Sequence, residues 1–132
     1  MTFSSVYDRM RGALPTKMLF IGLLVLLLWG VLRSTPPQQY FDHSDKVLHI
    51  LAFSSVAFVG RLAMLMMRGV VFWPFMLLGA ASLEWVQGWM WETRHFSLLD
   101  AASNVLGVFV AAGAYLVVKQ SLGLTSGRQR TY

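Results

Sequence analysis

Residues 18–32 read MLFIGLLVLLLWGVL, an apolar run without a single charge. Three further apolar blocks follow at 47–67, 70–91 and 98–118. A helix of about 21 residues is about 31 Å long, which matches the hydrocarbon core of a bilayer. No block shows the alternation of apolar and polar residues that is typical of a barrel strand. The sequence therefore predicts an all-α, polytopic membrane protein with about four transmembrane helices.

The composition agrees with a bilayer as the solvent. The chain has 132 residues, of which 56% are hydrophobic and 13% are charged, whereas a soluble domain carries about 25% charged residues. It contains no cysteine, which excludes disulfides, thiolate nucleophiles and cysteine-ligated metals. The net charge of +5 comes from basic residues that lie between the apolar blocks and form no dense run. We therefore expect a membrane topology signal and no nucleic-acid partner.

Lysine and arginine predict the orientation, because cytoplasmic loops carry an excess of both. One side of the membrane would hold Arg9, Arg11, Lys17, Arg68, Lys119, Arg128 and Arg130, and the other only Arg33, Lys46 and Arg94. The first side is predicted to be cytoplasmic, with both termini inside. The predicted parts are a cytoplasmic N-terminal segment (1–17), a four-helix transmembrane domain (18–118) and a basic cytoplasmic tail (119–132). No A-x-A-like cleavage site follows the first block, so we expect a retained span and no signal peptide.

Polar side chains lie inside three of these apolar blocks. Asp45, Lys46 and His49 open the second block, Glu84 and Gln87 lie in the third, and Asp100 and Asn104 open the fourth, with Arg94 just before it. Ionisable groups within a membrane span are costly, so they count by default as a functional-site hypothesis. In the predicted topology all of them fall in the outer leaflet. We therefore predict an outward-facing polar pocket between the second, third and fourth spans, with the first span beside them.

Helical spacing predicts which faces are buried. The pair Asp100 and Asn104 continues as Gly107 and Ala111 at helical spacing, which gives one stripe that is polar at the top and small below. Small residues let transmembrane helices approach closely, so this stripe is predicted to face the bundle interior. Arg61, the cation inside the second block, is expected to snorkel to the interface.

The polar cluster allows several kinds of chemistry, and the candidate ligand-binding residues are Asp45, Lys46, His49, Glu84, Gln87, Arg94, Asp100 and Asn104. The carboxylates could pair with cations, either Asp45 or Asp100 with Arg94, and Glu84 with His49 or Lys46. Lys46 and Arg94 could instead hold the phosphate or carboxylate of a ligand. A network of this kind could also serve only to fix the register of the helices.

Catalysis is a further possibility for three of these residues. A buried carboxylic acid can act as a general acid and a histidine near it as a base, so the catalytic candidates are His49, Glu84 and Asp100. His49 with these carboxylates could also ligate a divalent metal. The sequence has no metal-binding motif such as H-E-x-x-H, so we predict neither a metal nor a cofactor.

The polar residues stand in short motifs with a defined order. These are D-K-V-L-H at 45–49, E-W-V-Q at 84–87, Arg94 with Ser97, and L-D-A-A-S-N-V-L-G at 99–107. In this combination they resemble the VanZ-like family of small bacterial integral membrane proteins, over about 41–118. The chain departs from the family pattern in having no proline between Gln87 and Arg94. The resemblance implies a multi-pass protein of the bacterial cytoplasmic (inner) membrane with a role in the cell envelope. The family is named for a member linked to resistance against the glycopeptide teicoplanin, and the resemblance implies no established catalytic mechanism.

Together these observations favour an envelope protein whose polar pocket binds a lipid-linked or other polar envelope ligand. The expected partners are membrane lipids, with a lipid-linked envelope precursor or a membrane protein as further candidates. Two alternatives stay open. One is an intramembrane acid–base enzyme acting on a lipid or lipid-linked substrate, and the other is a non-catalytic scaffold or subunit of a membrane complex.

Overall fold

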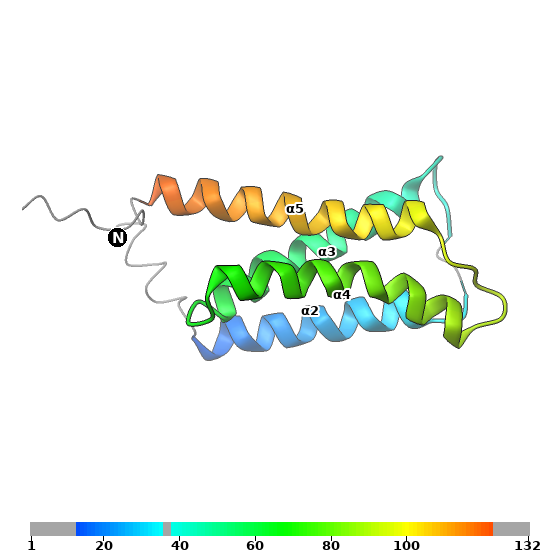
Figure 1. The fold of residues 1–132 in the computed structure, drawn as a ribbon, viewed down its shortest axis with the longest axis horizontal. Helices are drawn as coiled ribbons and strands as arrows, with labels where there is room; N and C mark the ends of the chain where they lie inside the picture. Colours follow the sequence, from blue (N-terminus) through cyan, green and yellow to red (C-terminus); the bar gives the residue numbers. More distant parts are fainter. Residues whose placement is uncertain (1–12, 36–37, 123–132) are drawn as a thin grey trace, which may run out of the picture.

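A computed structural model of the chain describes residues 13–35 and 38–122 (Figure 1). These residues form four helices: α2 (Leu14–Leu32), α3 (Ser44–Ala63), α4 (Gly69–Met90) and α5 (Leu98–Ser121). All four are long and apolar enough to cross a membrane. The prediction of an all-helical chain with four membrane-length helices is therefore confirmed. Most of the predicted N-terminal segment (1–17) and basic tail (119–132) lies outside the described residues, while α2 begins before the predicted residue 18 and α5 ends after residue 118.

The four helices run lengthwise beside one another and alternate in direction (Figure 1). The α2–α3 and α4–α5 connections lie at one end of the bundle, which we call the site end. The start of α2, the α3–α4 connection and the end of α5 lie at the opposite end (Figure 1). The largest helix interface joins α3 to α5, while α2 packs mainly on α3, and α4 mainly on α5. The order of packing thus places α3 and α5 at the centre of the bundle.

Small residues explain why α3 and α5 pack so closely. A Cβ atom at Gly107 would lie 2.7 Å from the carbonyl oxygen of Ile50 and 2.9 Å from Cβ of Phe53. Ala111, one turn further along α5, is 1% exposed. The predicted stripe on α5 therefore faces the bundle interior, as its helical spacing indicated. The structure shows that α3 is the helix it packs on, with direct backbone contact at Gly107.

Arg61 hydrogen-bonds the connection between α3 and α4 from inside the bundle. Its side chain is buried, and Nη1 donates to the carbonyl oxygens of Met64, at 3.0 Å, and Met67, at 2.9 Å. The guanidinium lies 5.6 Å from the ring centre of Phe72 and 5.2 Å from that of Tyr115. The guanidinium thus reaches carbonyl groups of the turn that need a donor, and two aromatic faces that accept a cation. The expectation that Arg61 snorkels to the interface stays a prediction.

Candidate functional site

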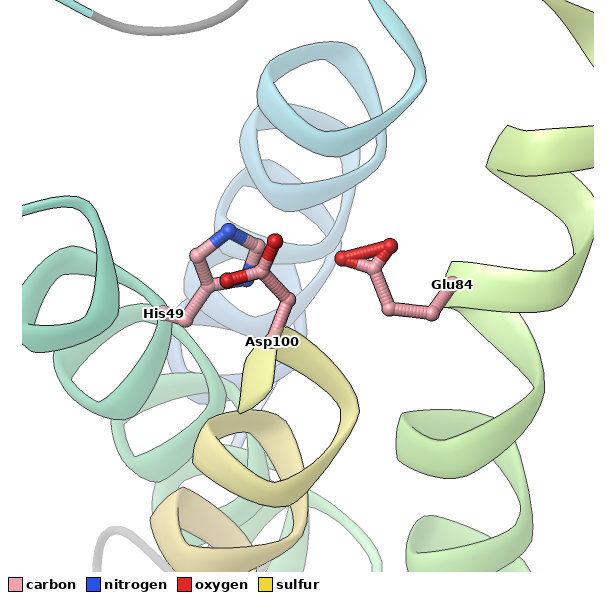
Figure 2. A group of neighbouring side chains, drawn as sticks. All are labelled: His49, Glu84 and Asp100. Atoms are coloured by element: carbon pink, nitrogen blue, oxygen red, sulfur yellow. The ribbon is translucent and has the colours of Figure 1, made fainter. Parts of the chain in front are cut away.

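Three predicted polar residues from three helices meet near the site end. His49 comes from α3, Glu84 from α4 and Asp100 from α5, and their ligand atoms all lie within 4.8 Å of one another. Figure 2 shows the imidazole and the two carboxyl groups pointing toward one another. We call these three side chains the polar triad. Its assembly depends on the antiparallel order of the helices, which brings the first turns of α3 and α5 and the last turns of α4 to the same end.

Lys46 forms the ion pairs beside the triad. Its Nζ lies 2.5 Å from Oδ2 of Asp45 and also contacts Oδ1 of Asp100. Asp100 sits in the first turn of α5, where its backbone N–H bonds Oγ of the N-cap Ser97 at 3.2 Å and the helix dipole favours a carboxylate. Lys46 thus ties the start of α3 to the start of α5. In the structure Lys46, and not Arg94, makes the ion pairs of both aspartates, because it follows Asp45 directly on α3 and reaches Asp100 across the interface of α3 with α5.

Asn104 fixes the protonation pattern of His49. The amide is fully buried; its Nδ2 donates to the carbonyl oxygen of Ala80 at 3.2 Å, and its Oδ1 lies 2.6 Å from Nδ1 of His49. Because Oδ1 can only accept, Nδ1 of the imidazole must carry the hydrogen and donate it. A neutral His49 therefore keeps an unprotonated Nε2, whose lone pair is available to a proton or a cation.

Glu84 is the least compensated group of the site. Its side chain is 1% exposed, and within the described part of the chain its Oε1 has no hydrogen-bond partner. Its charged neighbours include Asp100, Arg94 and Lys46. Burial of a polar atom without a partner is costly, and two carboxylates that face each other repel. A proton, a cation or a ligand would relieve both costs.

Gln87 lies apart from the triad, although it shares a face of α4 with Glu84. Its buried Nε2 donates to the carbonyl oxygen of Val31, and Nε1 of Trp91 donates to that of Leu32 at 2.8 Å. These two donors satisfy carbonyl groups at the end of α2, which have no partner within their own helix. Gln87, a predicted ligand-binding candidate, thus ties α4 to α2. Sequence reasoning did not identify this role, because nothing in the pattern connects Gln87 to α2.

An apolar groove of about 420 Å³ runs between α2 and α3. Leucine, valine and alanine side chains line most of it, and Trp29, Arg33, His49 and Arg94 are its larger polar or amphipathic members. The guanidinium of Arg33 lies 5.6 Å from the ring centre of Trp29. His49 belongs to both the groove and the polar triad, so the two features are continuous. The sequence predicted the first span only as a neighbour of the pocket. The signal that could have shown its contribution to the groove was the spacing of Trp29 and Arg33, which lie four residues apart at the end of the span.

No family model, curated protein or solved structure matches the chain. The fold and the site therefore define the protein by class. Its described residues form four membrane-length helices, with a polar triad near one end, in which Glu84 is buried, and an apolar groove that leads to that triad.

Proposed function

We propose that the chain is a VanZ-like, multi-pass protein of the bacterial cytoplasmic membrane whose outward-facing site binds an envelope lipid or lipid-linked precursor through an anionic head group. The observation that carries the proposal is the groove between α2 and α3, which combines apolar walls with two arginines and reaches His49 of the triad. The family assignment rests on the motifs between residues 41 and 118.

The charge distribution supports the outward direction of the site. Lys17, Arg68 and Lys119 belong to the end opposite the site, while Arg33, Lys46 and Arg94 belong to the site end. In the sequence, Arg9 and Arg11 precede α2, and Arg128 and Arg130 follow α5. The positive-inside rule then assigns the opposite end, with both termini, to the cytoplasm and the site end to the outer leaflet.

The groove has the chemistry of an amphiphile site. Its apolar walls suit an acyl or prenyl chain, because such a chain loses no hydrogen bonds there. Neither Arg33 nor Arg94 makes an ion pair with any residue between 13 and 35 or between 38 and 122. Guanidinium groups bind phosphate through paired N–H donors, and Trp29 has the ring type that is enriched at membrane interfaces. A lipid phosphate at the site end of the groove would therefore meet two available cations.

The test is an analysis of the lipids that accompany the protein in native membrane patches. We expect one class of anionic lipid to be enriched over the bulk membrane, and we expect the enrichment to be lost in the double variant Arg33→Gln/Arg94→Gln. The matched control is Arg68→Gln, which removes an exposed cation at the opposite end. Lipids of bulk composition in the wild type, or equal loss in the control, would contradict lipid binding. A stoichiometric protein partner in their place would favour the scaffold alternative.

The polar triad also favours a second candidate, an intramembrane acid–base enzyme acting on the bound lipid. Its supporting observation is His49, whose Nδ1 is hydrogen-bonded to Asn104 and which lies beside Glu84 and Asp100. In such a reaction His49 would accept a proton from the attacking group, and a carboxylic acid would donate one to the leaving group. Turnover by the purified protein that Glu84→Gln abolishes would support this role. Tight lipid binding without any turnover would argue against an enzyme and favour a lipid-binding protein.

A further inference from the structure

We propose that His49, Glu84 and Asp100 form a binding site for one divalent transition-metal cation, such as Zn²⁺ or Mn²⁺. The donors come from α3, α4 and α5, so a bound cation would join the three helices at one point. The same residues take part in the proposed function, but the metal site is tested with the metal alone and stands or falls independently of any lipid.

The donor set suits such a cation. One imidazole nitrogen and two carboxylates are ligands that Zn²⁺, Mn²⁺ and Fe²⁺ accept, and a site with three protein ligands leaves positions for water or substrate. A metal-bound histidine generally donates its second N–H to an oxygen acceptor, which fixes the ring and its tautomer. His49 has this arrangement, because Nδ1 donates to Oδ1 of Asn104 at 2.6 Å and Asn104 is itself held by the carbonyl of Ala80.

Glu84 supplies the independent sign that a partner belongs at the triad. Its side chain is 1% exposed, and its Oε1 finds no hydrogen-bond donor within the described part of the chain. In Figure 2 its carboxyl group points toward His49 and Asp100. A shared proton would satisfy the two carboxylates, but it would leave the fixed imidazole lone pair unused. A metal cation uses all three groups at once.

The distances are close to those of a bound metal. The three ligand atoms lie within 4.8 Å of one another, and two bonds of about 2.1 Å allow a separation of at most about 4.2 Å. Side-chain rotation that moves the carboxylate oxygens by less than about 1 Å would bring the ligand atoms within this limit, because Glu84 has three rotatable bonds. Lys46 contacts Oδ1 of Asp100 but forms no ion pair with Glu84, so a cation at the triad would share Asp100 with Lys46.

A metal at the triad would also lie at the edge of the groove, because His49 lines both. It would then offer an open coordination position to a phosphate oxygen, next to the cations of Arg33 and Arg94. This consequence, unlike metal binding itself, rests on the proposed function.

Metal binding is measured on the full chain purified through a tag without histidines and treated with a chelator. Titration with Co²⁺, followed by visible absorption, and with Zn²⁺ or Mn²⁺, followed by calorimetry and elemental analysis, should give about one metal per chain. Glu84→Gln and His49→Gln should weaken binding by at least about 10-fold. The controls Glu92→Gln and His43→Asn remove an exposed carboxylate and an exposed imidazole, and Asn tolerates the left-handed backbone at residue 43; both should bind like the wild type.

X-ray absorption of the metal-loaded wild type keeps the test independent of how the variants fold. It should show one imidazole nitrogen among otherwise oxygen ligands. Absence of stoichiometric binding for all three metals overturns the proposal. Wild-type affinity in folded Glu84→Gln, or a coordination shell without imidazole, overturns it as well.

Discussion

Replacement of Gly107 by alanine tests the close contact between α3 and α5 on which the site depends. The added Cβ would lie 2.7 Å from the carbonyl oxygen of Ile50, 2.9 Å from Cβ of Phe53 and 3.1 Å from the backbone nitrogen of Ser54. Two of these three atoms belong to the backbone of α3, so a side-chain rotation cannot relieve the contact. The two helices must move apart instead.

The size of the effect follows from these distances. Ordinary contact needs about 3.4 Å, so α3 and α5 would separate by about 0.7 Å at this level. Overpacking of this kind costs about 1–3 kcal/mol of the free energy of unfolding. The hydrogen bond between His49 and Asn104, one turn away and 2.6 Å long, would stretch toward the limit of about 3.2 Å for such bonds and lose part of its contribution of about 1 kcal/mol.

The assay is unfolding of the purified protein in mixed micelles by added denaturing detergent, followed by tryptophan fluorescence and circular dichroism. The control is Gly113→Ala on the same helix, where an added Cβ meets nothing within 4 Å. This control should be neutral or stabilising by up to about 1 kcal/mol, because alanine favours a helix over glycine. If Gly107→Ala is as stable as Gly113→Ala, the argument from the contact of α3 with α5 is refuted.

Three further substitutions test the polar contacts by the same unfolding assay. Asn104→Leu should cost about 1–3 kcal/mol, because it leaves the Nδ1 hydrogen of the half-buried His49 without an acceptor; an unchanged midpoint would contradict that bond. Lys46→Met should destabilise by about 1–3 kcal/mol, because two carboxylates lose their cation, and adding Asp100→Asn should restore part of the loss; additive losses would exclude the pair. Arg61→Gln should cost about 2 kcal/mol and speed proteolysis of the α3–α4 connection, whose carbonyls lose their donor; unchanged cleavage would contradict this role.

The membrane-length helices could be predicted because hydrophobic length is a local property. Each block contains enough consecutive apolar residues to indicate a span without any knowledge of its neighbours. The stripe from Asp100 to Ala111 could be predicted for the same reason, since helical spacing alone places these residues on one face. The start of α2 at Leu14 was harder to predict from the sequence. Its first turn, Leu14, Pro15 and Thr16, comes before the purely apolar run, and proline is tolerated in the first turn of a helix.

The partners of the polar residues were harder to predict, because they depend on which helices touch. The sequence placed His49, Glu84 and Asp100 near one depth, and the structure brings them together. The sequence did not indicate that Lys46 would pair with Asp100, since that contact requires the first turns of α3 and α5 to be adjacent. The role of Gln87 escaped prediction for the same reason, because its acceptor belongs to a helix 56 residues away in the chain.

The arrangement separates two tasks among the helices. The polar triad is built by α3, α4 and α5, its three residues lie within the part of the chain proposed to be VanZ-like, and its geometry depends on the packing of Gly107 against α3. The groove needs α2 as its second wall, and α2 lies before that part. A change in the leucine-rich face of α2 would therefore alter which apolar chain fits the groove while leaving the triad intact. Under the proposed function, the three later helices would determine what chemistry can occur at the site, and α2 would determine which lipid can reach it.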